Sequence, residues 1–236
     1  MPKQTRTLCH LLIPWFGPWP IYFPAFLVTC APNTRFEWLI LSDTPSPPAH
    51  PPNVRFAHLT LTDFNFRLKQ HCRLDFAVPE DAIYKICDLR WPYGQMFADQ
   101  LCDVPHWAIC DIDQLWGNIL GHLTEDLFRT HHILTTRHFK ALLKQKPAKN
   151  WWKRVLAPRH PRIYCEKVLV NYGDDHLAMR DDQYIEWRNG RTYIAEGQEL
   201  IYLHFHRLKA TIRSCNFTYG DNPRRICLSR YEILGN

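Results

Sequence analysis

Near-continuous apolar runs recur in the first half of the chain. They occupy residues 7–13, 37–42 and 106–110, and a shorter run covers 54–59. A strand that is buried on both faces is apolar at nearly every position, so these runs predict buried β-strands. The segments between them have helical spacing. Strands that alternate with helices predict an α/β protein with a mostly parallel sheet.

Three segments between the strands are predicted to be helical. Residues 21–31 form an apolar helix with Pro24 in its first turn, where proline is tolerated. Residues 64–74 have helical spacing with basic residues outward, and Thr62 is the predicted N-cap. Residues 82–101 are predicted to be helical around a break at the sequence WPYG.

Residues 11–28 carry no charge and follow two basic residues, as a signal peptide or membrane anchor would. Four prolines lie within this stretch, and each removes a backbone donor that a spanning helix needs. No small-residue cleavage pattern of the usual kind is present. We therefore expect a rigid aromatic loop at 14–20 and a soluble protein.

The composition is that of a stiff, folded chain. Of its 236 residues, 46% are hydrophobic and 14% aromatic, and 18 prolines stand against nine glycines. These values exclude wholesale disorder, a collagen-like chain and a coiled coil. The nine cysteines include no CxxC pair, so a zinc ribbon is not expected. Their odd number and their scatter among apolar residues predict buried, reduced thiols in a cytosolic protein.

The net charge of +6 suits contact with an anion. Much of it lies in residues 137–167, which hold ten Lys or Arg and one acid around Trp151 and Trp152. A basic segment of this kind is most often a solvated surface. Its two tryptophans make a peripheral membrane contact the leading alternative, and nucleic acid is the least favoured partner.

Two carboxylates directly follow the predicted strand at 106–110. Asp111 and Asp113 form a D-x-D sequence at the carboxyl end of that strand, where open α/β sheets bind ligands. Carboxylate oxygens suit Mg²⁺ or Mn²⁺, which commonly bridge to phosphate oxygens. A solvated turn is the alternative.

A histidine pair marks a late strand at 200–205. His204 and His206 alternate along the chain and would meet one ligand if both side chains faced the same way. The alternative is one surface and one packed histidine. Lys209 would place a fixed positive charge beside any phosphate held there.

Four further residues are candidates for ligand contacts. Trp15 lies in the aromatic loop, whose rings can cover a nucleobase, and Asp43 ends the second strand, where it can accept hydrogen bonds from a ribose or base. Lys85 and Asp88 precede the D-x-D strand. The alternatives are a loop cap for Asp43 and a helix face for Lys85 and Asp88. No G-x-G-x-x-G or Walker A sequence is present, and spacing identifies no Ser-His-Asp triad.

The order of several motifs carries a resemblance. The sequences are IPWFGPWP at 13–20, LILSD at 39–43, YKICD at 84–88, WAICDID at 107–113 and LHF at 203–205. Together they resemble a family of bacterial glycosyltransferase-like proteins formerly of unknown function, DUF6625-like. The chain is more distantly similar to sugar transferases of the GT-A type.

The resemblance implies a fold and a metal site. The fold would be a GT-A-like, Rossmann-type, mostly parallel sheet flanked by helices in a single domain. Residues 1–120 would form its nucleotide-sugar-binding half, and residues 121–236 its acceptor-side half. Asp111, Asp113 and His204 would hold Mn²⁺ or Mg²⁺ on the donor diphosphate.

The resemblance also implies donor contacts and a function. Lys209 would contact the diphosphate, and the remaining donor contacts would be Trp15, Asp43, Lys85 and Asp88. The enzyme would transfer a sugar from a nucleotide sugar to a surface glycan or lipid-linked saccharide, in lipopolysaccharide or polysaccharide biosynthesis. It would work in the cytoplasm, with peripheral contact at the inner membrane face through 137–167. No residue is identified as a catalytic base.

Departures from the family pattern keep other functions open. Arg137 stands where a glycine is expected, and no clear Asp-Glu pair for acceptor binding lies between 140 and 190. One alternative is therefore a non-catalytic nucleotide-sugar-binding scaffold protein of the same fold. A less favoured alternative is a metallo-phosphoesterase that uses His204, His206 and the aspartates.

Overall fold

The computed structural model describes most of the chain in nine stretches. They are residues 6–73, 75–90, 92–131, 133–135, 163–165, 172–173, 184–194, 197–205 and 208–236. The chain divides into two compact units. The first comprises Met1–Ile112 and Thr218–Asn222, and the second comprises Asp113–Phe217 and Pro223–Asn236. The chain passes from one unit to the other within the D-x-D sequence.

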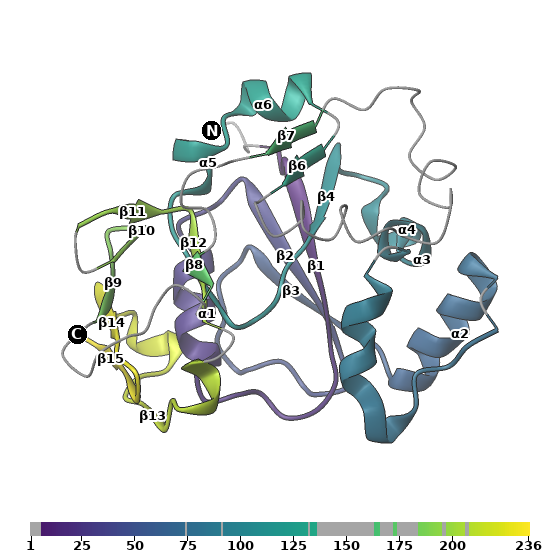
Figure 1. The fold of residues 1–236 in the computed structure, drawn as a ribbon, viewed down its shortest axis with the longest axis horizontal. Helices are drawn as coiled ribbons and strands as arrows, with labels where there is room; N and C mark the ends of the chain where they lie inside the picture. The colour runs from purple at the N-terminus through teal and green to yellow at the C-terminus, as the bar shows by residue number, and fades with distance from the viewer. Residues whose placement is uncertain are drawn as a thin grey trace. The chain divides into compact units, whose positions relative to one another are not determined.

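A parallel sheet forms the centre of the first unit (Figure 1). Its four strands lie in the order β3-β2-β1-β4, and every neighbouring pair is parallel. The strands are β1 (Cys9–Trp15), β2 (Phe36–Ser42), β3 (Val54–His58) and β4 (His106–Ile109). β1 and β2 are almost entirely buried, as their apolar runs require. The predicted α/β class and parallel sheet are confirmed.

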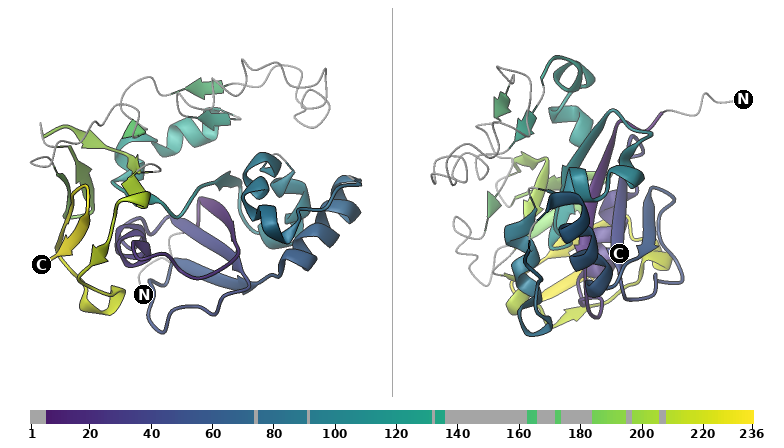
Figure 2. Two further views of the ribbon diagram at one scale, coloured as in Figure 1. Left: turned by 60° about the horizontal axis from the view of Figure 1, so that its bottom comes forward. Right: turned by 90° about the vertical axis from the view of Figure 1, so that its right-hand side faces the viewer.

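Helices flank this sheet on both faces. They are α1 (Phe23–Cys30), α2 (Leu61–Cys72), the 3-10 segment η1 (Glu80–Leu89), α3 (Tyr93–Met96) and α4 (Ala98–Leu101). α1 lies on one side of the sheet, and α2, α3 and α4 lie on the other (Figures 1 and 2). Leu12 and Leu39 of the sheet share one buried cluster with Phe64, Tyr93 and Phe97. Burial of these large side chains holds α2 and α3 on the sheet.

The helical stretch expected at 82–101, with a break at WPYG, is confirmed only in part. The structure has the 3-10 segment η1 followed by the two short helices α3 and α4. Ala82 lies outside helical geometry, at φ −133° and ψ 38°. Pro92, with no backbone N–H to donate, directly precedes α3. The apolar spacing over this stretch is therefore met by three short segments.

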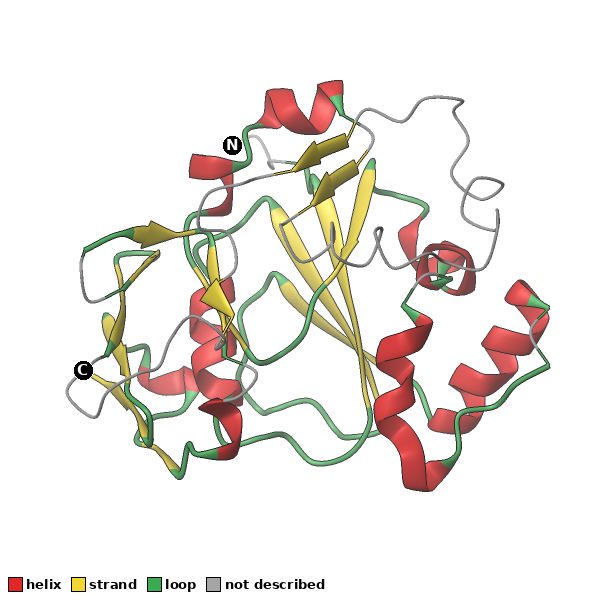
Figure 3. Cartoon of the chain, viewed as in Figure 1, coloured by secondary structure: helices red, strands yellow, loops and turns green. Residues whose placement is uncertain are grey.

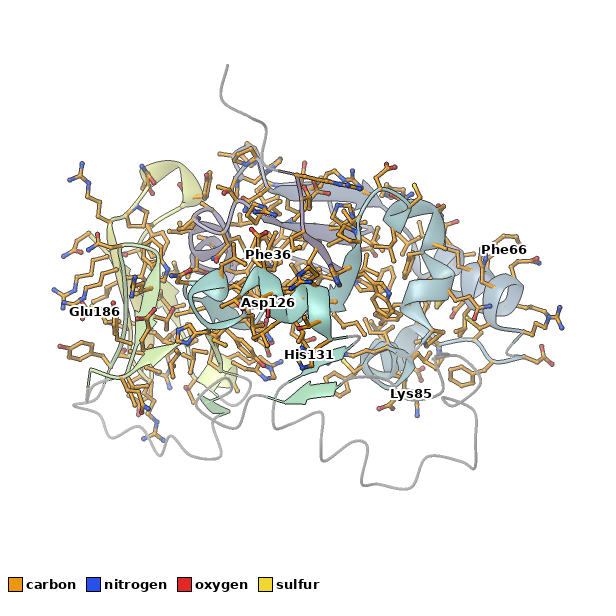
Figure 4. All side chains as sticks on the ribbon, turned by 90° about the horizontal axis from the view of Figure 1, so that it is seen from above. Phe36, Phe66, Lys85, Asp126, His131 and Glu186 are labelled. Carbon is orange, nitrogen blue, oxygen red and sulfur yellow. The ribbon has the colours of Figure 1, made fainter. Side chains whose placement is uncertain are left out.

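The N-cap of α2 is Thr60, and the prediction of Thr62 is wrong. The hydroxyl of Thr60 accepts a hydrogen bond from the backbone N–H of Asp63 at 3.0 Å. The Asp63 carboxylate accepts in return from the backbone N–H of Thr60 at 3.0 Å, which completes a capping box. The helix ends at Cys72 and is followed by the C-cap residue Arg73, which has a left-handed φ of 53°. Phe66 lies on the solvent side of this helix (Figure 4).

The described part of the second unit is mostly strands and loops (Figure 3). Its larger sheet has the order β11-β10-β9-β14-β15-β13. Those strands are β9 (Ile185–Arg188), β10 (Arg191–Tyr193), β11 (Glu199–Leu200), β13 (Ser214–Cys215), β14 (Arg225–Leu228) and β15 (Glu232–Gly235). Trp187, Ile226, Leu228 and Ile233 are buried on one face of this sheet.

A smaller sheet of the second unit has the order β5-β12-β8. Its strands are β5 (Gln114–Trp116), β12 (Tyr202–His204) and β8 (Tyr172–Gly173). The remaining elements of the chain are β6 (Ile133–Thr135), β7 (Ile163–Cys165), α5 (Ile119–His122), α6 (Glu125–Thr130), η2 (Leu208–Ala210) and η3 (Tyr219–Asp221), of which η3 belongs to the first unit. The single strand expected at 200–205 is thus two short strands, β11 and β12.

Three other expectations meet the structure only in part. Within the described ranges, no helix has the length and apolar character needed to cross a bilayer. The basic segment 137–167 lies outside the described residues apart from the backbone of β7.

Burial raises the pKa of the Cys9 thiol to about 12 and that of Cys30 well above its usual value. Cys102 is exposed, so the prediction of buried thiols does not hold for every cysteine.

Replacing Thr60 with alanine tests the capping box. We expect Thr60→Ala to lower the free energy of unfolding by about 1 kcal/mol, because the N–H of Asp63 loses its acceptor. The matched control is Thr62→Ala, at an exposed position inside α2, and its effect should stay within about 0.5 kcal/mol. Urea unfolding of both variants measures the difference. A larger loss for Thr62→Ala would contradict the assignment.

Candidate metal centre

Strand pairing inside the second unit brings two distant residues beside Asp113. β5 follows Asp113 directly and pairs antiparallel with β12, with Gln114 opposite His204. The backbone N–H of Phe205 donates to the Asp113 carbonyl oxygen at 3.0 Å, which continues this pairing by one residue. The N–H of Lys209 donates to the Phe205 carbonyl at 3.0 Å and turns the chain back. Both His204 and Lys209 are thereby placed at Asp113.

The Asp113 carboxylate contacts two basic side chains. Its Oδ1 lies 3.2 Å from Nε2 of His204, and its Oδ2 accepts a hydrogen bond from Nζ of Lys209 at 2.7 Å. The Asp113 side chain is 4% exposed, whereas those of His204 and Lys209 are 19% and 32% exposed. A buried charge is costly unless it is paired, and here each carboxylate oxygen has a basic partner.

These partners determine the charge of Asp113. Burial raises the pKa of Asp113, but the imidazole of His204 at 3.2 Å and the hydrogen bond and charge of Lys209 lower it by more. The net result is a pKa well below the usual value for an aspartate. Asp113 is therefore ionised at neutral pH, which is the form that a metal ion needs.

Asp111 belongs to the first unit and has a basic partner there. The backbone N–H of Cys110 donates to the Leu12 carbonyl at 3.5 Å, so the parallel pairing with β1 continues to the edge of Asp111. Nη2 of Arg90 donates to Oδ1 of Asp111 at 2.5 Å. The next residue, Ile112, is buried. Asp111 and Asp113 flank Ile112, so Asp113 begins the second unit two residues after Asp111.

Asp111, Asp113 and His204 fit a divalent metal ion. One ligand atom from each lies within 4.8 Å of the other two. Two carboxylates and an imidazole suit Mg²⁺ or Mn²⁺, and three protein ligands leave coordination positions for phosphate or water. The predicted D-x-D and late histidine are thus brought together. His206 lies outside the described residues, so its predicted part in a ligand pair stays a prediction.

Asp43 and Trp15 stabilise the first loop. The backbone N–H of Gly17 donates to Oδ1 of Asp43 at 3.0 Å, and the hydroxyl of Thr44 donates to the Gly17 carbonyl at 2.6 Å. The indole N–H of Trp15 donates to the same carbonyl at 3.0 Å. Gly17 has a φ of 105°, which favours glycine. Asp43 therefore acts as the loop cap that we gave as its alternative role.

Lys85 and Asp88 lie exposed on η1 (Figure 4 labels Lys85). Their neighbour Ile86 is buried and holds the segment against the core of the first unit. The sequence interpretation missed Arg90, the residue that binds Asp111. The sequence feature that could have pointed to Arg90 is its position as a basic residue immediately before the WPYG break.

Comparison with known proteins places the chain in a family. A family described as a family of unknown function (DUF6625) matches residues 11–172, which is more than half of the chain. The chain belongs to this family. The match includes Arg90, Asp111 and Asp113 and ends before His204 and Lys209. No curated protein and no solved structure gives a significant match.

The lowered pKa of Asp113 predicts how its stabilising effect depends on pH. A depressed pKa contributes stability above the unfolded value, about 3.9 for aspartate, and that stability is lost as the pH falls towards the folded value. We expect Asp113→Asn to lower the free energy of unfolding by about 2 kcal/mol at pH 7. Below about pH 4 the difference from the wild type should shrink.

Denaturant unfolding with a chelator present measures this difference without a contribution from bound metal. The control is Asp126→Asn, whose carboxylate forms an exposed pair with Arg129 and should matter by less than about 0.5 kcal/mol. Equal effects of the two substitutions at pH 7 would contradict the stabilising role of Asp113.

Proposed function

We propose that this protein is a metal-dependent glycosyltransferase that moves a sugar from a nucleotide sugar to a glycan or lipid-linked saccharide. The observation that carries the proposal is the buried Asp113, which lies between His204 and Lys209 and two residues from Asp111. Two carboxylates and an imidazole suit Mn²⁺ or Mg²⁺, and a lysine beside them suits a diphosphate.

We further propose that the parallel sheet belongs to a fold of the GT-A type. Support comes from its order, β3-β2-β1-β4, and from the position of Asp111 just after β4. Ligands of open α/β sheets bind at the carboxyl ends of the strands. The motif order that resembles sugar transferases provides the second line of support.

The roles proposed for the side chains follow from their chemistry. Asp111, Asp113 and His204 would hold the metal, which when bound supplies positive charge to the leaving nucleoside diphosphate. The ammonium group of Lys209 already donates to Asp113. It has three N–H donors, so it can also donate to phosphate oxygens of the donor. Trp15 ends β1, donates to the loop that Asp43 caps, and offers a flat ring for a base.

The remaining contacts are proposed on the resemblance. Lys85 and Asp88 are exposed and accessible to a donor. The acceptor would be a surface glycan or a lipid-linked saccharide, with the basic segment 137–167 in peripheral contact with the cytoplasmic face of the inner membrane. Such contact suits the interleaved basic residues and tryptophans of that segment.

Calorimetric titration tests the donor site. We expect UDP- or GDP-sugars to bind in the presence of Mn²⁺, and the affinity to fall by at least about tenfold in Asp111→Ala, because a metal ligand is lost. Asp126→Ala, in an exposed pair on α6, is the control and should bind as the wild type does. Failure of every nucleotide sugar to bind would refute the proposal.

A transfer assay separates the enzyme from the scaffold alternative. Incubation with the bound nucleotide sugar and a panel of saccharide and lipid-linked acceptors should release the nucleoside diphosphate and yield a glycosylated product. Donor binding with neither transfer nor hydrolysis across the panel would favour the non-catalytic scaffold.

A further inference from the structure

Each aspartate of the D-x-D sequence has its own cation. In the first unit Arg90 donates to Asp111 at 2.5 Å, and in the second unit Lys209 donates to Asp113 at 2.7 Å. The two negative charges that would attract a metal are thus each balanced within their own unit.

Arg90 is held at Asp111 by few other polar contacts. It is the C-cap residue of η1, and the same Nη2 atom that meets Asp111 lies 3.4 Å from Sγ of Cys87. Sulfur is a weak hydrogen-bond acceptor. The side chains of Arg90 and Asp111 are 34% and 29% exposed, so water and small ligands can reach the pair.

Another arginine of the same unit shows what a purely structural pair looks like. Arg67 binds both carboxylate oxygens of Asp99, at 2.8 and 3.0 Å. It also donates to the Met96 carbonyl at 2.9 Å and lies 5.5 Å from the ring centre of Phe97. Arg67 therefore ties two segments together, whereas Arg90 contacts a single carboxylate oxygen and a thiol.

The charge of Arg90 opposes a metal at Asp111. The guanidinium of an arginine stays protonated in proteins, so Arg90 is positively charged where it meets Asp111. A divalent ion bound to Asp111 would meet this positive charge at close range and compete for the same oxygen. Phosphate groups can take over the guanidinium, since its planar fork matches their oxygens.

We propose that Arg90 is an exchangeable counter-cation, which holds Asp111 until metal and nucleoside diphosphate bind together and then donates to the diphosphate. This inference rests on the proposed function, since it names a further donor-binding residue of the same site. Its consequence is that metal and diphosphate bind cooperatively. Because such coupling is reciprocal, each ligand raises the affinity for the other by the same factor.

Titration of the full chain with Mn²⁺, with and without saturating UDP or GDP, measures this coupling. In Arg90→Gln we expect Mn²⁺ alone to bind about tenfold more tightly, because its competitor at Asp111 is gone. The gain in Mn²⁺ affinity on adding the nucleotide should shrink by a similar factor. Electron paramagnetic resonance of free Mn²⁺ reports binding without reference to activity.

Two further variants complete the experiment. Arg67→Gln removes a similar half-buried ion pair away from Asp111 and should leave both Mn²⁺ affinities unchanged. Arg90→Lys keeps the charge but loses the fork, so Mn²⁺ alone should bind as weakly as in the wild type while the nucleotide binds less tightly. It also remains informative if Arg90→Gln does not fold.

The outcomes separate this inference from the proposed function. If the wild type binds Mn²⁺ and nucleotide but Arg90→Gln shows unchanged or weaker Mn²⁺ binding, Arg90 is structural and the inference is overturned. If neither protein binds Mn²⁺ under any condition, the proposed metal centre fails, and the inference fails with it.

Discussion

The buried negative charge of Asp113 is the constraint on which the candidate site depends. A carboxylate that is 4% exposed must have compensating partners, and the chain supplies them from β12 and η2. The antiparallel pairing of β5 with β12 is what delivers them. Gly117 permits that pairing to continue, since a Cβ there would clash with the Leu200 carbonyl oxygen, while its N–H donates to Ile201 at 2.6 Å.

Charge balance within the site has a functional side. Asp111 and Asp113 are each paired with a basic side chain, which stabilises the protein in the absence of ligand. A metal ion would therefore have to share each carboxylate with that basic side chain. A phosphate group that accepts hydrogen bonds from Arg90 would weaken the contact of Arg90 with Asp111, and one that accepts from Lys209 would weaken the contact of Lys209 with Asp113. The same ion pairs therefore stabilise the fold and are suited to couple the binding of a cation and an anion.

The pattern of apolar residues predicted secondary structure correctly where an element is buried along its whole length. It was less accurate where an element is only partly buried. The runs that became β1 and β2 are buried along almost their whole length, so their composition predicts strands. The stretch 82–101 has a mixed pattern, and Ala82 and Pro92 interrupt it, so spacing alone suggested one broken helix. Thr60 and Thr62 are equally good caps by composition. The backbone geometry that lets Thr60 bind Asp63 decides between them.

The sequence by itself determined the parallel sheet and the placement of two aspartates after one of its strands. Strands and their ends follow from which neighbouring residues must be buried, and that information is local. Only the tertiary structure decided that Lys209 meets Asp113 from 96 positions away, and that Arg90 meets Asp111 from 21 positions away. Such contacts depend on strand pairing and on the path of the chain between elements, because no spacing rule relates residues so far apart.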